Sequence, residues 1–307
     1  MRYFKILAAV LLLSVPALAL ADISSVPGDS AWYFHADFDA MRKGKASRGL
    51  YDWLDAEVFA EIRKEIGIDF NKEARTLTAF SARNDGPIIV LDGKIAQETK
   101  DKLMALGAAA SGGNLDPLKA HGKEFFLFEG DGDADIDADI DIDIVSLEKE
   151  SFISFALKDK ILITHRREQM EALLGNNGRI PTARKDRNTL FVLQADRALM
   201  QAGVNTDAFD GDEWDSNIVR NTKQIAVLLA DLGDKLGLEA RLITTEPAMA
   251  NSLASIVRGL LSLSMFSDEM DPDMAEVLQR TTVDVDDATL TVGLELDPES
   301  VVSALED

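Results

Sequence analysis

The chain has 307 residues, of which 54 are Asp or Glu and 32 are Lys or Arg, so its formal net charge is −22 at pH 7. A surface of this sign repels nucleic-acid phosphates and anionic lipid head groups, and we therefore expect no nucleic-acid partner. The length suffices for one large core or two ordinary ones. The absence of cysteine excludes disulfides and thiol chemistry.

Residues 1–21 have the pattern of a secretory signal peptide. Arg2 and Lys5 precede an apolar run, and Ala19-Leu20-Ala21 forms a small-residue cleavage site before Asp22. The apolar run is too short to span a bilayer as a helix. We therefore expect cleavage after Ala21, export to the periplasm, and a mature chain without a transmembrane segment.

A nine-residue pattern occurs twice, at Ala36–Gly44 and at Ala195–Gly203. In both copies Ala and Asp are adjacent, Met follows the Asp by four positions, and Gly follows it by seven. An apolar run precedes each copy, so each predicts a strand that turns directly into a short helix. The Asp residues are expected as N-caps, the Met residues in the core, and the Gly residues at left-handed helix ends. These positions are Asp37, Met41 and Gly44, and Asp196, Met200 and Gly203.

The first repeat is predicted over residues 22–178. Apolar spacing of three and four residues predicts helices, and alternation around turn residues predicts hairpins. A loop is expected from Gly107, and a strand near Phe125 is extra to the repeat. The other expected elements are strand Ala31–Ala36, helix Ser47–Ile66, strands Thr76–Ser81 and Pro87–Leu91, helix Ile95–Leu106, strands Phe152–Leu157 and Ile161–His165, and helix Arg166–Leu174.

Residues 179–188 are basic and polar and contain Pro181, which indicates a linker. The second repeat follows over residues 189–307. Its elements match the first in order, β-α-β-β-α-β-β-α. The expected elements after the repeated pattern are strands Ile225–Asp231 and Leu236–Thr244, helix Pro247–Phe266, helix Asp273–Arg280, strands Thr282–Val285 and Thr289–Leu296, and helix Pro298–Leu305. The fold class is thus α+β, with two related repeats, each an antiparallel sheet packed by helices on one face. Whether the two sheets are joined stays open.

Helix Pro247–Phe266 carries an apolar stripe at helical spacing. The stripe is expected to pack against the sheet of its own repeat, and the alternative is a docking helix for lipid or a partner. Its residues are Met249, Leu253, Ile256, Val257, Leu260 and Leu263.

An acidic insertion near residues 129–150 interrupts the first repeat. Seven aspartates occupy alternate positions: Asp131, Asp133, Asp135, Asp137, Asp139, Asp141 and Asp143. From Asp137 the spacing follows an EF-hand loop, but Ile142 stands where the sharp turn needs Gly, and no paired helices flank the run. A match to the metal loop of phosphohexomutases is accidental, because Ile136 replaces its Arg. The preferred interpretation is a solvated insertion, and weak calcium binding by the seven aspartates is the alternative.

The sequence contains no catalytic motif. His35, His121 and His165 are the three histidines, and none belongs to a nucleophile, zinc or phosphate motif. We therefore expect no cofactor other than calcium, and a non-catalytic exported module that binds a protein or a small molecule. The alternatives are a calcium-binding module and, third, a hydrolase that uses only Asp and Glu.

Near its start the mature chain contains Val26-Pro27-Gly28-Asp29-Ser30, its first predicted strand ends in Ala36-Asp37, and its last is Thr289–Leu296. In these features and in its twofold plan it resembles a loose group of exported bacterial proteins of unknown function. The resemblance implies a repeated α+β fold and an extracytoplasmic location, and it carries over no functional residue.

Overall fold

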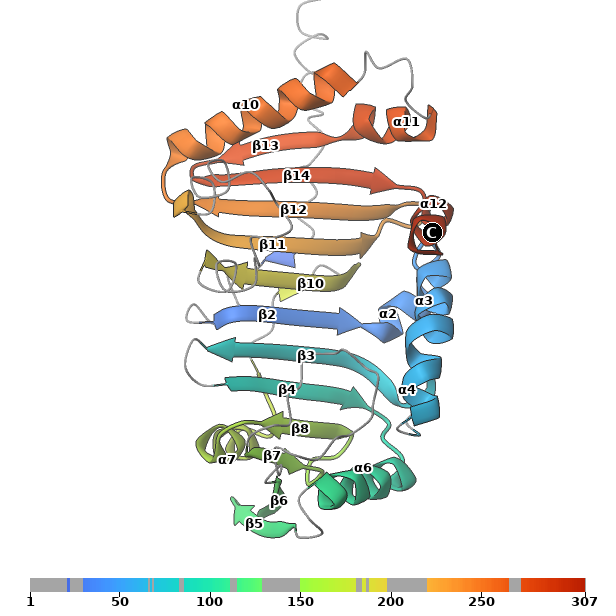
Figure 1. The fold of residues 1–307 in the computed structure, drawn as a ribbon, viewed down its shortest axis with the longest axis vertical. Helices are drawn as coiled ribbons and strands as arrows, with labels where there is room; N and C mark the ends of the chain where they lie inside the picture. Colours follow the sequence, from blue (N-terminus) through green and yellow to red (C-terminus); the bar gives the residue numbers. More distant parts are fainter. Residues whose placement is uncertain are drawn as a thin grey trace, which may run out of the picture.

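The computed structural model is an α+β fold built on one twelve-stranded antiparallel sheet (Figure 1). It describes residues 21–22, 30–65, 67, 69–82, 86–110, 115–128, 150–180, 184–185, 188–197, 220–264 and 272–306. The strand order is β13-β14-β12-β11-β10-β2-β3-β4-β8-β7-β6-β5. A separate two-stranded ladder pairs β1 (Ala21–Asp22) with β9 (Arg184–Lys185).

Strands from both predicted repeats lie in this one sheet. The first half contributes β2 (Ser30–Asp37), β3 (Ala74–Ala82), β4 (Gly86–Gly93), β5 (Asp116–Ala120), β6 (Lys123–Phe128), β7 (Ser151–Ser154) and β8 (Lys160–Thr164). The second half contributes β10 (Thr189–Asp196), β11 (Thr222–Asp231), β12 (Leu236–Thr244), β13 (Thr282–Asp286) and β14 (Thr289–Leu296). The halves meet at the antiparallel pair of β2 and β10, where Tyr33 lies opposite Gln194 and His35 opposite Val192. The question that the sequence left open is thereby resolved.

Helices gather at the ends and faces of the sheet (Figure 1). At one end of the strands lie α2 (Phe38–Lys43), α3 (Arg48–Leu54), η2 (Asp55–Phe59), α4 (Ala60–Glu65) and α12 (Pro298–Glu306), with α5 (Phe70–Glu73) joining the first group to β3. The outer strands of the first half carry α6 (Gln97–Ala110) and α7 (Arg167–Gly175). The outer strands of the second half carry α10 (Pro247–Ser264) and α11 (Pro272–Arg280).

Both faces of the sheet are covered in the first half, which corrects the expectation of helices on one face. Consecutive strand residues point to opposite faces, and β8 carries apolar residues at both Ile161 and Leu162. Leu162 packs with Met170 and Leu174 of α7. Ile161 belongs instead to the core cluster that includes Leu103 of α6. A strand that is apolar on both faces needs a cover on each.

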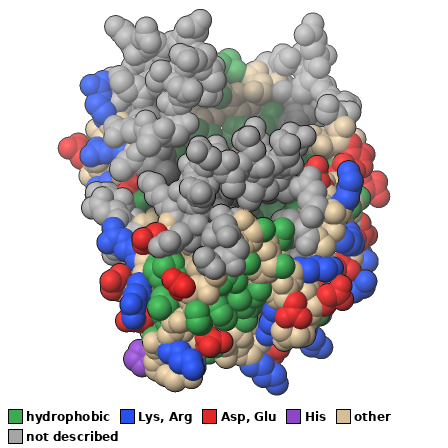
Figure 2. All heavy atoms as spheres, turned by 60° about the horizontal axis from the view of Figure 1, so that its bottom comes forward, with side chains coloured by type: hydrophobic (Ala, Val, Ile, Leu, Met, Phe, Trp, Pro, Cys, Tyr) green, Lys and Arg blue, Asp and Glu red, His purple; other side chains and the backbone are tan. Residues whose placement is uncertain are grey.

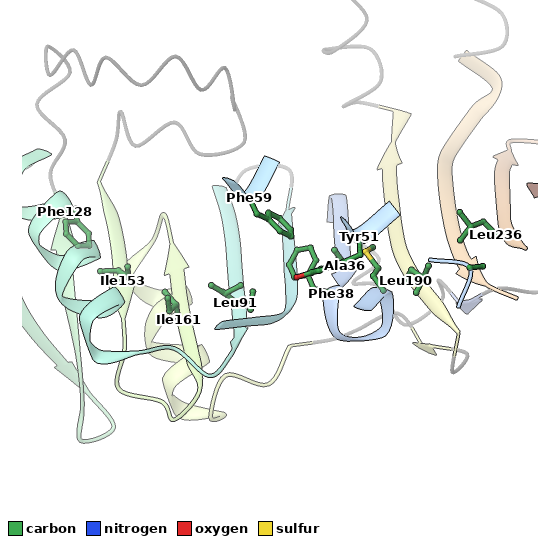
Figure 3. Close-up of a cluster of buried hydrophobic side chains, with 13 residues drawn as sticks. Ala36, Phe38, Tyr51, Phe59, Leu91, Phe128, Ile153, Ile161, Leu190 and Leu236 are labelled. Carbon is green, nitrogen blue, oxygen red and sulfur yellow. The ribbon is translucent and has the colours of Figure 1, made fainter. Parts of the chain in front are cut away.

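The largest core cluster extends across the sheet and joins the two halves. Figure 3 shows its side chains in a row from Phe128 and Ile153 through Leu91 to Leu190 and Leu236. Because members come from both halves, burial of this cluster favours the joined sheet over two separate ones.

Arg42 fixes the helical layer to the start of β3. Its guanidinium donates to the backbone carbonyls of Asn71 and Ala74 and lies over the ring of Tyr51, 5.4 Å from the centroid. Burial raises the pKa of Tyr51, and its hydroxyl donates to Asn71 Oδ1 at 3.0 Å.

Most predicted elements are present, with three local corrections. Asp37 caps α2 as predicted, because its carboxylate accepts from the amide of Ala40 at 2.9 Å, and Met41 is buried. Gly44 ends α2 in extended backbone, with φ −70° and ψ 147°, so the prediction of a left-handed cap there is wrong. Helix α6 continues to Ala110 through the expected loop, and β5 was not predicted. Met200 and Gly203 lie outside the described residues.

The two edges of the sheet are protected against pairing with other chains. On β13, Asp284 and Asp286 are exposed, and Arg258 of α10 donates to the carbonyl of Val283 at 2.6 Å. On β5, Pro117 and Lys119 are exposed. Charge and proline on edge strands discourage edge-to-edge aggregation.

Residues 129–149, which contain the aspartate run, connect two strands that pair directly, because Phe128 of β6 lies opposite Ser151 of β7. We predict that a loop of about four residues can replace them without loss of the fold, since short loops join antiparallel neighbours. The melting temperature should stay within about 3 °C of the parent, and neither protein should gain stability in calcium over chelator. If the parent binds calcium at micromolar concentrations and the variant does not, the result would support the calcium alternative instead.

Candidate binding cleft at the junction of the two halves

The turn between α2 and α3 is bound to the hairpin between β11 and β12 by one buried carboxylate. Asp231, only 9% exposed, accepts from the amide of Ser47 at 2.9 Å, and its Oδ2 lies 2.8 Å from Ser47 Oγ. Its second oxygen accepts from the amide of Gly233 at 2.7 Å. Because a carboxylate hydrogen bond is stronger than a neutral one, this contact between residues 184 positions apart is a firm link between the halves.

The link between Asp231 and Ser47 requires glycine at position 44. The backbone conformation of Gly44 does not, because any residue can adopt it. A Cβ at Gly44 would lie 2.1 Å from Asp231 Oδ2 and 2.2 Å from Ser47 Oγ. No side chain fits at these distances, so the glycine allows the carboxylate to reach the turn. The repeated pattern in the sequence therefore identified the correct residue but assigned it a wrong role.

A second ion pair positions the closing helix beside the same hairpin. Lys235 Nζ lies 2.9 Å from Asp297 Oδ2, and Asp297 Oδ1 accepts from the amide of Glu299 at 3.1 Å at the start of α12. Two hydrogen bonds lower the pKa of Asp297: the bond from Lys235 has the larger effect, and the bond from the amide of Glu299 has the smaller one. The same pair raises the pKa of Lys235. Pro298 suits the first turn, where its missing N–H has no helical partner.

These contacts leave a cleft of about 550 Å³ between the halves, which we call the junction cleft. Its walls come from the α2–α3 turn and α3, from the β11–β12 turn, and from α12. Part of the lining is apolar or small, and part is charged. The lining residues are Lys45, Ala46, Gly49, Gly233, Asp234, Asp297, Pro298, Glu299, Val302, Ser303 and Glu306.

The junction cleft is acidic. Asp297 is paired with Lys235, whereas Asp234, Glu299 and Glu306 are exposed and form no ion pair within the described part of the chain. Among the described residues that line the cleft, Lys45 is the one basic residue. A ligand in the cleft thus meets small and apolar surface at Ala46, Gly49 and Val302 and carboxylates around it, an arrangement suited to an organic cation.

The sequence-predicted residues do not form this site. The run from Asp131 to Asp143 lies outside the described residues, so its calcium binding stays a prediction. The histidines lie on separate elements: His35 on β2, with Nδ1 2.7 Å from Thr78 Oγ1, His121 in the β5–β6 turn, and His165 after β8. Among the described residues, no group of three or more His, Asp or Glu is arranged to hold a metal ion.

Sequence reasoning missed the junction cleft because its parts are three short segments far apart in the chain. The sequence predicts Asp231 only as the end of a strand and Pro298 only as the start of a helix. The one usable signal was Gly44, which is repeated at Gly203 and lies beside the buried carboxylate.

Comparisons with known proteins identify a similar fold and no family. No protein-family model and no curated protein matches the chain. Among solved structures, TP0453 in crystal form IV matches with a TM-score of 0.50 and 10% identity, covering 94% of this chain and 98% of that one. Crystal forms III and I of TP0453 match with TM-scores of 0.47 and 0.42 and 9% identity, covering 92% and 94% of this chain and 97% of theirs. At this identity the likeness concerns the fold alone.

Within the described residues, no helix has both the length and the apolar character needed to cross a membrane.

We predict that Ser47→Ala lowers the free energy of unfolding by about 1–3 kcal/mol, because Asp231 loses the hydroxyl beside it while remaining buried. Urea unfolding followed by circular dichroism measures this. Ser303→Ala is the matched control, since Ser303 lines the same cleft but is exposed, and it should change stability by less than about 0.5 kcal/mol. Equal effects of the two variants would contradict the proposed link.

We also predict that Lys235→Gln raises the pKa of Asp297 toward its ordinary value, as followed by carboxyl NMR titration. A carboxyl group whose pKa is lowered in the folded state stabilises the fold at pH values above its ordinary pKa. This stabilisation is lost as the pH falls through the lowered pKa. The variant should therefore lose stability near neutral pH and lose less than the parent on acidification. Lys45→Gln is the control, and an Asp297 pKa that Lys235→Gln leaves unchanged would count against the pair.

Proposed function

We propose that the mature chain is an exported, periplasmic binding protein without catalytic activity, and that the junction cleft holds a small organic cation. Export is supported by the leader pattern of residues 1–21. Binding is supported by a single observation, the junction cleft of about 550 Å³ between the two halves. Small-molecule sites commonly have volumes of about 300–1,000 Å³ and favour such interfaces.

The twofold plan supports this location. Outward from the centre, the first half runs β2-β3-β4-β8-β7, followed by β6 and β5, and the second runs β10-β11-β12-β14-β13. When β5 and β6 are set aside and the strands of each half are numbered along the chain, both halves have the order first, second, third, fifth, fourth. We propose that the halves are copies of one unit and that β5 and β6 belong to the insertion in the first copy. The α2–α3 turn of one copy then meets the β11–β12 turn of the other, and the cleft exists only when both are present.

The charge of the lining indicates the ligand class. Asp234 and Glu299 come from different walls, so an ammonium or guanidinium group between them would meet carboxylates from two sides. Exposed ion pairs contribute about 0.2–1 kcal/mol each, and the apolar part of the ligand would contribute by contact with Val302. A modest, salt-sensitive affinity follows.

We predict that the mature protein binds spermidine or arginine amide in isothermal titration calorimetry, and that uncharged analogues of the same size bind at least about tenfold more weakly. The paired substitution Asp234→Asn with Glu299→Gln should weaken binding about tenfold. Val302→Trp should abolish binding by filling the cleft.

The matched control is Asp116→Asn with Glu124→Gln, which removes the same charge from exposed positions on β5 and β6. It should leave the affinity unchanged at physiological salt, because distant exposed charges are screened. Binding that weakens equally in the control would mean that net charge alone attracts the cation. No binding of any cation, or full binding by Val302→Trp, would overturn the proposal.

A further inference from the structure

Opposite charges line opposite walls of the junction cleft. On the face that Figure 2 shows, basic and acidic side chains are interspersed over the described surface. In the cleft they are separated, because the wall from the first half carries Lys45 and no carboxylate. The wall from the second half carries the carboxylates that form no ion pair within the described part of the chain, which are Asp234, Glu299 and Glu306. The cleft is therefore positive on one side and negative on the other.

Lys45 is not used by the fold. Each of the basic residues around it forms an ion pair at 2.9–3.2 Å. These residues are Lys43, Arg48 and Lys235, and their partners are Asp39, Asp52 and Asp297. Lys45 forms no ion pair with any described residue, although carboxylates line the same cleft. Charges that stand too far apart to neutralise each other are available to a ligand that reaches both.

The backbone holds Lys45 in position on its wall. The two residues that follow it, Ala46 and Ser47, are buried, and the amide of Ser47 donates to Asp231 at 2.9 Å. The side chain of Lys45 is exposed. Binding an anion at Lys45 thus requires one side chain to become ordered and no rearrangement of the turn, which limits the entropic cost.

The start of α12, on the opposite wall, does not compete for an anion. A helix N-terminus attracts negative charge, but here the protein already supplies it. Oδ1 of Asp297 accepts from the amide of Glu299 at 3.1 Å, and Glu299 adds a second carboxylate in the first turn. Among the described lining residues, Lys45 is the one cation without a partner, so an anionic group of a ligand would turn toward the first half.

We propose that the ligand of the junction cleft is a basic amino acid with a free carboxylate, such as arginine. Lys45 binds the carboxylate, and the two cationic groups meet Asp234 and Glu299. The unpaired charges of the described lining are one positive and three negative, and arginine carries two positive charges and one negative. This inference rests on the proposed function, in which the cleft holds an organic cation, and it adds the anionic group and the residue that recognises it.

Isothermal titration calorimetry of the mature protein with arginine and with agmatine, which is arginine without its carboxylate, tests the role of Lys45. Lys45→Glu should weaken arginine binding at least about fivefold, because the carboxylate then meets a like charge. The same substitution should leave agmatine binding unchanged or strengthen it, since agmatine carries only positive charges. Lys45→Gln should weaken arginine binding about threefold, and Lys45→Arg, which keeps the charge, should stay within about twofold of the parent.

Lys119→Glu is the matched control. Lys119 is also exposed and forms no ion pair with the described residues, and it lies on β5 at the far edge of the sheet. At physiological salt it should change neither affinity by more than about 1.5-fold, because distant exposed charges are screened. Melting curves should show that each variant folds like the parent.

The outcomes separate this inference from the proposed function. If Lys45→Glu strengthens the binding of both compounds, the cleft recognises cations alone, which overturns the inference and leaves the proposed function standing. Equal weakening of arginine binding by Lys45→Glu and Lys119→Glu would also overturn the inference. If neither compound binds to the parent, the proposed function fails and the inference fails with it.

Discussion

The antiparallel pairing of β2 with β10 is the contact on which the rest of the molecule depends. Five residue pairs, from Trp32–Ala195 to Ala36–Phe191, join strands that lie 159 positions apart in the chain at the repeated Ala-Asp pairs. These are the strands that enter the two copies of the repeated pattern. Through this ladder the halves become one sheet, apolar side chains of both halves share the largest core cluster, and the α2–α3 turn is brought to the β11–β12 hairpin.

The secondary structure could largely be predicted, because alternation and helical spacing depend on neighbours in sequence. The cap at Asp37 and the neighbouring strands Ile225–Asp231 and Leu236–Thr244 follow from local chemistry. Strand β5 could not be predicted, because Asp116, Pro117 and Lys119 favour a loop, and its pairing with β6 overrides that preference. The second helical layer could have been inferred from Ile161 and Leu162, which are both apolar on one strand.

The candidate site could not be predicted, because its geometry arises from long-range contacts. Lys45, Asp234 and Glu299 become neighbours only after the sheet is formed, and none carries a local motif. The most unusual segment, the aspartate run, drew attention by composition and lies outside the described residues. Gly44 illustrates this limit. The repeat identifies its position, but glycine is needed there because the carboxylate of Asp231, 187 positions later in the chain, lies 2.1 Å from where a Cβ would be.

The most direct test of this account is native-state hydrogen exchange on the mature protein, comparing the slowest amides of β3 and β11. Because β2 and β10 join these strands in one sheet, the account predicts a single opening free energy for both, as in one cooperative unit. If β11 exchanges through an opening that leaves β3 protected, the halves fold independently. The junction cleft would then lie between two mobile units, which would contradict the account.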